Sequence, residues 1–213
     1  LTAQILRFKD LKPAGMESNI FMYHLKALIK EGYIIKMDIG YTLTSKGKHY
    51  VDRTNLDSLI IRIQPKSITI IYVENEQGKM AILERLHQPF IGYKGFPSGK
   101  IHYGESLDQS ATRELYEKTG LVNKQLKLRG TFIMKFRNNK EIVNHIIGYV
   151  FAGVAPIKEE LDYHNKYFRS YWGDKSELYQ DNRFKGHPEL FELLETTNPD
   201  RLFFAEHEFT SDF

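Results

Sequence analysis

An arginine and several glutamates lie close together near the middle of this chain. Glu105 is followed by Arg113, Glu114 and Glu117. Residues three or four positions apart on a helix share one face, so positions 114, 117 and 118 would project into one site. Oxygen-ligated Mg²⁺ or Mn²⁺ can bridge phosphate oxygens and activate water. A row of carboxylates on one helix face is a way to hold such ions, so the pattern indicates a site for a divalent cation.

The pattern of apolar residues predicts the elements that position these side chains. Leu107, Ala111 and Leu115 recur at i, i+4 and i+8, which predicts a helix over residues 106–118. Gly120 is placed to end that helix. Runs rich in β-branched and aromatic residues predict strands on both sides of it, and a last amphipathic stretch predicts a closing helix. The predicted strands cover residues 67–73, 79–85, 130–135 and 142–151, and the closing helix lies near 188–195.

The helix belongs to a longer motif that runs from Gly99 to Leu121: Gly-x5-Glu-x7-Arg-Glu-Leu-x-Glu-Lys-Thr-Gly-Leu. This motif resembles the Nudix box, G-x5-E-x7-R-E-U-x-E-E-x-G-U, in which U is an aliphatic residue. One defined position departs, because Lys118 stands where the last glutamate belongs. The resemblance implies that residues 66–213 form an α/β/α Nudix sandwich. It also implies Mg²⁺- or Mn²⁺-dependent hydrolysis of a nucleoside diphosphate linked to another moiety.

The resemblance also implies roles for the residues of the box. Glu114 and Glu117 would be metal ligands, and Glu105 would be an outer ligand or a support. Arg113 would hold a carboxylate in place through a bidentate pair. Gly99 would serve the tight backbone of the loop and the binding of the substrate.

Lys118 is the difficulty in this assignment, because the position is a metal ligand in many family members. An ammonium beside a dication reverses an interaction of roughly 4 kcal/mol per unit-charge pair at an effective dielectric of ~20. Either the lysine swings away on its flexible stem or metal binding is weakened. A domain that binds nucleotide with little or no turnover is the alternative function.

Outside the box the candidates depend on position alone. Family members often carry a catalytic base on a later loop, where Glu159, Glu160 and Asp162 are the candidates. Arg85, Phe90, Tyr93 and Phe96 are candidates for a base or ribose pocket, although aromatic residues at such positions are as often part of the core.

Residues 1–55 predict a separate, basic module. They carry nine Lys and Arg against five Asp and Glu, a net charge of +4, which leaves −1 for the rest of a chain of net charge +3. An apolar face between residues 18 and 31 predicts a helix, and two β-rich runs around Asp38-Ile39-Gly40 predict a hairpin. Residues 55–65 read as a connector to the second module.

The order of a helix and then a hairpin resembles the winged helix-turn-helix of bacterial and archaeal regulators. The matching residues are Tyr23-His24-Leu25-Lys26-x-Leu28, Gly32-Tyr33-Ile34 and Tyr41-x-Leu43-Thr44-x-x-Gly47. In such folds one helix enters the major groove and the hairpin contacts the backbone. The resemblance implies that double-stranded DNA is a partner and that its contacts are Asn19, Tyr23, Lys26 and Lys46. A docking or dimerisation module is the alternative.

Composition excludes several classes of protein. The chain has no cysteine, so disulfides, thiol nucleophiles and thiolate metal sites are excluded. No apolar run approaches the ~20 residues of a membrane span, and no signal-peptide pattern is present, so we expect a cytoplasmic protein. Three functions stay open: a hydrolase, a nucleotide-sensing transcription regulator, and a hydrolase that its first module only dimerises. We expect a homodimer.

Overall fold

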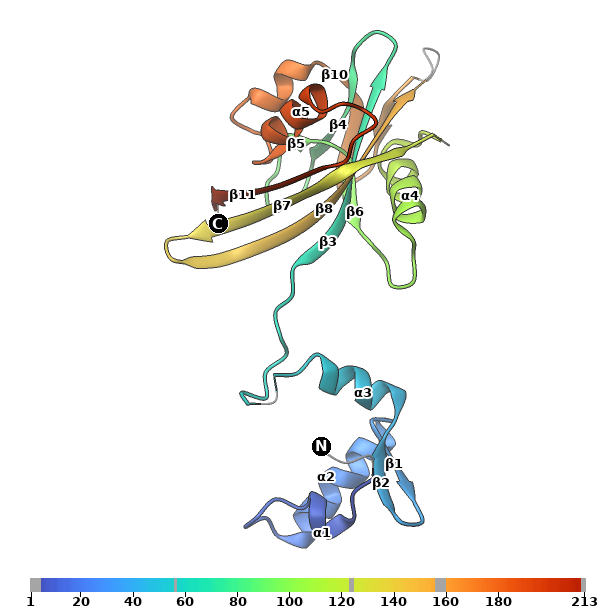
Figure 1. Cartoon of the computed structure of the whole chain (residues 1–213), viewed down its shortest axis with the longest axis vertical. Coiled ribbons are helices and arrows are strands. Elements are labelled where there is room, and N and C mark those ends of the chain that lie inside the picture. Colours follow the sequence, from blue (N-terminus) through green and yellow to red (C-terminus); the bar gives the residue numbers. More distant parts are fainter. Residues whose placement is uncertain (1–4, 56, 123–124, 156–159, 212–213) are drawn as a thin grey trace. The chain divides into compact units, whose positions relative to one another are not determined.

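The computed structural model describes residues 5–55, 57–122, 125–155 and 160–211. The chain forms two compact units, Leu1–Ile63 and Gln64–Phe213 (Figure 1). The division falls within the stretch 55–65 that the sequence predicts as a connector. Among the described residues, no helix is long and apolar enough to cross a membrane.

The described residues of the first unit form three helices and one hairpin. Its elements are α1 (Phe8–Leu11), α2 (Ser18–Lys30), β1 (Ile34–Met37), β2 (Gly40–Leu43) and α3 (Ser45–Asp52), with β1 and β2 antiparallel. Gly32 ends α2 in the left-handed region, with φ +76°. Thr44 caps α3 by accepting a hydrogen bond from the Gly47 N–H at 3.1 Å. The predicted helix and hairpin are therefore present, while the use of this unit on DNA stays a proposal.

The second unit is built on one mixed sheet. Its strands run in the order β11-β7-β8-β3-β4-β10-β9 in the described residues, with β5 paired to β4 and β6 paired to β3. The central strands β3 and β8 are parallel, as are the outer strands β7 and β11. The strands are β3 (Lys66–Asn75), β4 (Met80–Arg85), β5 (Lys94–Gly95), β6 (Ser98–Lys100), β7 (Lys127–Asn138), β8 (Glu141–Ala155), β9 (Asp162–His164), β10 (Phe168–Gly173) and β11 (Phe203–Thr210).

Helix α4 (Leu107–Thr119) covers one face of this sheet. Ser106 begins it with a capping box, in which its hydroxyl and the side chain of Gln109 each accept the other's backbone N–H. Ala111 and Leu115 are fully buried in a cluster with Ile71 of β3. Burial of a leucine side chain contributes about 1.5–3 kcal/mol, so this face fixes the helix against the sheet and directs its polar residues to the rim.

The opposite face is covered by the 3₁₀ helix η1 (Lys175–Tyr179) and by α5 (His187–Thr196) (Figure 1). Leu190 of α5 is fully buried against Phe132 of β7 and other residues of this second core cluster. Arg129 of β7 donates to the carbonyls of Leu194 and Thr197, which satisfies the C-terminal end of α5. Helices on both faces of a mixed sheet confirm the predicted α/β fold of this unit.

The structure adds elements that the sequence does not predict. Strand β11 follows the closing helix and pairs in parallel with β7, from Phe203 opposite Gly130 to Thr210 opposite Arg137. Strands β7 and β8 are also longer than predicted. Their extensions carry polar residues paired across strands, such as Arg137 with Glu208, and apolar spacing does not reveal such pairs.

Candidate active site

Arg113 is the centre of a cluster of three glutamates. Its guanidinium donates to both carboxylate oxygens of Glu105 at 2.5 and 2.8 Å, to Glu114 Oε1 at 2.7 Å and to Glu117 Oε2 at 3.2 Å. It also donates to the Lys100 carbonyl at 3.1 Å. One cation therefore gathers three carboxylates from the loop and from two turns of α4, and it anchors them to β6.

Of the three glutamates, Glu105 accepts the most hydrogen bonds. The hydrogen bonds from Arg113, with the backbone N–H of His102 at 2.8 Å, lower the pKa of Glu105 from 4.5 to about 2. The same hydrogen bonds raise the pKa of Arg113, with Glu105 as the largest cause. Glu105 is therefore charged at any ordinary pH. Since both of its oxygens are occupied, it supports the cluster more than it offers a free ligand.

Glu114 is buried against the backbone of Gly99. It is 4% exposed, although a solvent-facing position is the simplest expectation for a catalytic carboxylate. A Cβ on Gly99 would lie 2.0 Å from the carboxylate carbon, so no larger residue fits at 99 without moving the helix. Glu114 Oε2 is buried and has no hydrogen-bond partner in the described part of the chain. An unsatisfied buried carboxylate oxygen is costly and indicates a missing partner.

Lys118 lies beside that oxygen. Its Nζ is 3.8 Å from Glu114 Oε2 and 4.9 Å from the centre of the Phe168 ring. The contact is longer than a hydrogen bond, so the ammonium balances the charge of Glu114 without satisfying its oxygen. The residue that departs from the motif therefore lies within the cluster.

The motif implies Mg²⁺ or Mn²⁺, and the residues of the cluster show whether such an ion would fit. No group of three or more histidine or carboxylate side chains converges as a ready metal site within the described ranges. Mg²⁺ usually needs less, because it binds through one or two carboxylates together with water and substrate phosphates. The unpartnered oxygen of Glu114 and the half-exposed carboxylate of Glu117 fit that requirement. Lys118 is the competitor that an ion must displace.

A cavity of about 420 Å³ shares β6 with this cluster. Ser98 and Lys100 line the cavity, while Gly99 between them lies against Glu114, because successive residues of a strand point to opposite faces. The described lining contains cationic and aromatic side chains and no carboxylate. The cations are Lys66, Arg85, Lys100 and Lys185, and the aromatics are Phe90, Tyr93, Phe136 and Phe184.

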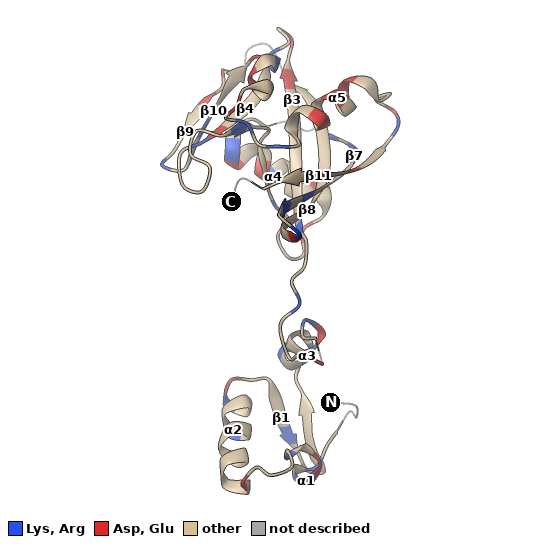
Figure 2. Cartoon of the chain, turned by 90° about the vertical axis from the view of Figure 1, so that its left-hand side faces the viewer, with Lys and Arg blue, Asp and Glu red and all other residues tan. Residues whose placement is uncertain are grey.

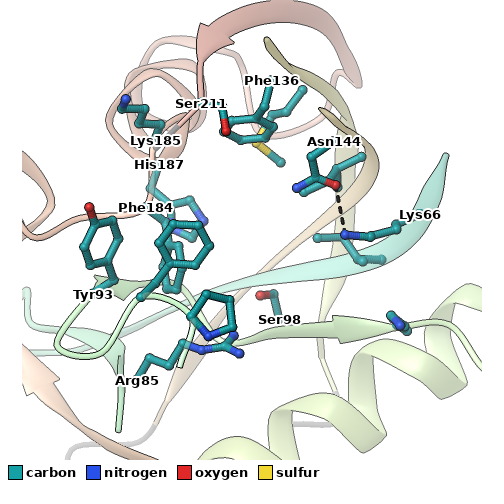
Figure 3. A pocket seen from close by; sticks show the side chains of 16 residues that line it. Lys66, Arg85, Tyr93, Ser98, Phe136, Asn144, Phe184, Lys185, His187 and Ser211 are labelled. Atoms are coloured by element: carbon teal, nitrogen blue, oxygen red, sulfur yellow. Dashed lines mark hydrogen bonds between the residues drawn. The ribbon is translucent and has the colours of Figure 1, made fainter. Parts of the chain in front are cut away.

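Figure 3 shows how the walls of the cavity are built. Lys66 and Asn144 come from β3 and β8 and are joined by a hydrogen bond of 2.9 Å. Tyr93 and Phe184 form the facing side, with ring centres 5.7 Å apart. Burial lowers the pKa of Arg85, which still leaves a guanidinium charged. Positive charge beside aromatic rings is suited to a ligand that has a phosphate and a planar base.

The remaining predicted residues fall in different places. Arg85 lines the cavity, and its contact with a substrate stays a prediction. Phe96 does not line the cavity: it is 2% exposed and packs in the core against Tyr72, so its assignment to a substrate pocket is corrected. Glu160 is exposed in a hollow next to Gly120 at the end of α4. Glu159 lies outside the described residues.

The predicted DNA contacts of the first unit divide into two groups. Asn19, Tyr23 and Lys26 are exposed on α2, with Tyr23 at 72%. Lys46 instead donates to the Glu31 carbonyl at 2.7 Å and lies 4.2 Å from the Tyr33 ring centre. Its charge stabilises the C-terminal end of α2, so Lys46 is a structural residue of the unit and a poor candidate for a DNA contact. Figure 2 shows lysines and arginines on α2 and β1.

Part of the cavity lining is not predicted by the sequence. Lys66, Lys185, Phe184 and His187 line the cavity from segments far from the motif. The only local signal near them is Gly186-His187-Pro188, which marks a helix start and not a ligand contact. The position of Lys118 against Glu114, in contrast, follows from the i,i+4 spacing alone.

Comparison with known proteins identifies the family and the fold. The family description NUDIX domain matches residues 64–196. An ADP-ribose pyrophosphatase of Methanocaldococcus jannaschii is 25% identical over 115 residues, 52% of this chain and 66% of that relative's length. Among solved structures, a MutT protein of Bacillus halodurans has a TM-score of 0.57 at 24% identity, covering 70% of this chain and 92% of its own. The NUDIX domain of Shewanella oneidensis NrtR, solved with ADP ribose, has a TM-score of 0.53 at 18% identity, covering 72% and 97%.

Proposed function

The chain belongs to the Nudix family, and from that premise we propose that it hydrolyses the diphosphate of a nucleoside diphosphate linked to another moiety. The proposal rests on the carboxylate cluster around Arg113, in which one oxygen of Glu114 has no hydrogen-bond partner among the residues that the structure describes. The cationic, aromatic cavity across β6 supports a nucleotide as the ligand. ADP-ribose is the first substrate to test, because the matched relative is an ADP-ribose pyrophosphatase.

In this proposal Glu114 and Glu117 hold Mg²⁺ or Mn²⁺. When bound, such an ion neutralises phosphate charge and makes water a better nucleophile. Arg113 fixes both carboxylates on α4, and the cavity's lysines and arginine hold the substrate's anionic part. Glu160 and Glu159 are the proposed bases that accept the proton of the attacking water. Cleavage of ADP-ribose by water gives AMP and ribose 5-phosphate.

Substitution of Glu114 tests this function. Glu114→Gln keeps the shape of the side chain and removes its charge, so Mg²⁺-dependent ADP-ribose hydrolysis should fall at least a hundredfold, on the order of the loss when a charge-stabilising group is removed. Because Glu114 is buried beside Arg113, a stability loss of about 1–3 kcal/mol should accompany it. The readout is product formation by chromatography, with and without a chelator.

Asp108→Asn is the matched control, since Asp108 is an exposed carboxylate of the same helix outside the cluster. It should retain full activity. Full activity in Glu114→Gln would place the reaction elsewhere.

Lys118 favours a second function, a nucleotide-sensing DNA-binding regulator with little or no turnover. Its ammonium occupies the neighbourhood of the oxygen that would hold the ion. The exposed Asn19, Tyr23 and Lys26 supply a surface on α2 that double-stranded DNA could contact. We propose a homodimer for this function, because winged helices commonly bind paired half-sites.

DNA binding is tested with two lysines of the first unit. Lys26→Ala should weaken binding to duplex DNA and lower the log–log salt slope by about 0.9, the contribution of one phosphate contact. Lys46→Ala should lower the thermal stability of the unit and leave the slope unchanged. Fluorescence anisotropy across a salt series measures the slope, and sedimentation gives the oligomeric state. An equal slope change in both variants would contradict the assignment.

A further inference from the structure

His187 is held in one orientation at the wall of the cavity. It begins α5, and its Nδ1 accepts the backbone N–H of Phe96 at 2.9 Å. Its ring stacks on the Phe96 ring at 15°, with centroids 5.1 Å apart. Gly95 leaves room for the ring, because a Cβ there would lie 2.3 Å from Nδ1. Contacts on both sides therefore fix the imidazole plane.

The same contacts fix the position of its proton. A nitrogen that accepts a hydrogen bond carries no hydrogen, so a neutral His187 must carry its proton on Nε2. Burial lowers the pKa of His187 to about 4, which keeps the ring neutral at neutral pH. His187 is 6% exposed and lines the cavity. Within the described part of the chain, Nε2 has no hydrogen-bond acceptor.

The surroundings indicate which acceptor this N–H meets. Phe184 lies beside His187, with ring centres 5.8 Å apart, and Tyr93 stands next to Phe184. Figure 3 shows these three side chains on one side of the cavity, with Lys66 across from them. Aromatic rings pack against a flat, apolar ring system, and a cation is suited to the phosphate end of a ligand. The neutral Nε2–H of His187, among the aromatic rings, is therefore placed to donate a hydrogen bond to the polar edge of a base.

We propose that His187 is a specificity-determining residue whose Nε2–H donates a hydrogen bond to an acceptor atom on the edge of a bound nucleobase. The inference rests on the proposed function, since it requires a nucleotide in the cavity. Because Nδ1 is committed to the backbone, the ring cannot turn its acceptor toward a ligand. A base edge that presents a donor at this point is rejected, and one that presents a ring nitrogen or a carbonyl is accepted.

The inference is tested first with the wild-type protein, by changing the ligand. The full chain is titrated by calorimetry, without metal, with AMP and with 1-deaza-, 3-deaza- and 7-deaza-AMP, each of which lacks one ring acceptor. One analogue should bind about three- to tenfold more weakly than AMP, the loss of one neutral hydrogen bond. The other two should bind about as AMP does. Equal affinity for all four nucleotides overturns the inference and leaves the proposed function intact.

A variant then assigns the lost hydrogen bond to His187. The amide oxygen of His187→Asn can replace Nδ1 as the acceptor for the Phe96 N–H, while the Nε2 donor is lost. In this variant AMP should bind three- to tenfold more weakly, and the penalty for the sensitive analogue should disappear, as in a double-mutant cycle. Binding of ribose 5-phosphate, which has no base, should not change. A penalty that persists in His187→Asn overturns the assignment.

An NMR measurement needs no variant. Long-range ¹H–¹⁵N spectra of the wild type should show His187 protonated on Nε2 and unprotonated on Nδ1 at neutral pH. The Nε2–H signal should move on addition of AMP and stay unchanged on addition of ribose 5-phosphate. A proton on Nδ1, or no response to AMP, overturns the inference. If neither AMP nor ADP-ribose binds the wild type, the inference and the proposed function fall together.

Discussion

The carboxylate cluster and the cavity differ in how their charges are used. In the cluster, the guanidinium of Arg113 is shared among Glu105, Glu114 and Glu117, so most of its charge is balanced inside the protein. In the cavity, positive side chains face a space whose described lining contains no carboxylate. In the cluster, Arg113 fixes the positions of the carboxylates. In the cavity, the positive side chains stay available to a ligand. Changes in the cluster should therefore affect stability and turnover together, whereas changes in the cavity should affect binding alone.

The largest effect is expected at Arg113. Arg113→Ala leaves three carboxylates close together without their shared cation, and one of them is buried. We expect a loss of about 3–5 kcal/mol in the free energy of unfolding and a fall in hydrolysis on the order of 10²–10³-fold. Urea unfolding and product assays measure the two. If stability were unchanged while activity fell, Arg113 would not hold the three carboxylates together as described above.

Lys118→Glu should produce the next largest effect, because it exchanges the competing cation for a possible ligand. Mn²⁺ or Mg²⁺ affinity should rise more than tenfold, since an ammonium beside a dication is unfavourable by roughly 4 kcal/mol at an effective dielectric of ~20. Mn²⁺ binding is followed by electron paramagnetic resonance. Lys118→Met separates loss of the cation from gain of a ligand. Turnover that rises with affinity favours the hydrolase, and turnover that stays negligible favours the regulator.

A cavity lysine should show a smaller effect, confined to binding. Lys100→Met retains the aliphatic stem and removes a charge that has no ion pair in the described residues. ADP-ribose should bind about three- to tenfold more weakly, the value of one charge-assisted contact. The free energy of unfolding should stay within about 0.5 kcal/mol. Lys127→Met, outside the cavity, is the control, and a large stability loss in Lys100→Met would remove the contrast between the two regions.

The smallest effect concerns pH. The pKa of Glu105 is lowered to about 2 in the fold, from 4.5, chiefly by Arg113. A lowered carboxyl pKa contributes stability that is present above pH 4.5 and is lost as the pH falls toward 2. The difference in unfolding free energy between the wild type and Glu105→Gln should therefore shrink across that window. Urea unfolding at pH 7, 4.5 and 3 measures it. A difference that stays constant with pH would mean that Glu105 is not held by charge.

The sequence predicts the cluster well because all of its parts are local. Residues 99–121 contain the capped helix, its apolar face and the i,i+3 and i,i+4 spacing that sets Glu114, Glu117 and Lys118 together. The burial of Glu114 against Gly99 is not readable in this way, because it depends on the pairing of β6 with β3.

Residue type and position single out Arg85, Phe90 and Tyr93 for a pocket, but the whole cavity could not be predicted, because its other residues meet them only in the folded domain. Lys66 begins β3, and His187 begins α5, more than a hundred residues later. Phe96 and Arg85 show that residue type and position alone do not separate a pocket residue from a core residue. Both were candidates for a pocket, and only the tertiary fold decides that one lies in the core and the other in the lining.

The parallel pairing of β11 with β7 affects the order in which parts of the protein fold during synthesis. The segment that carries Arg113 and its glutamates leaves the ribosome before β11 does, and the spacing within its helix needs only nearby residues. The cavity wall includes Ser211, directly after β11, so it is complete only when β11 has paired with β7. Pairing of strands so distant in sequence is slow to form. During synthesis, the segment with the carboxylate cluster is therefore present before the cavity that would bind a nucleotide is complete.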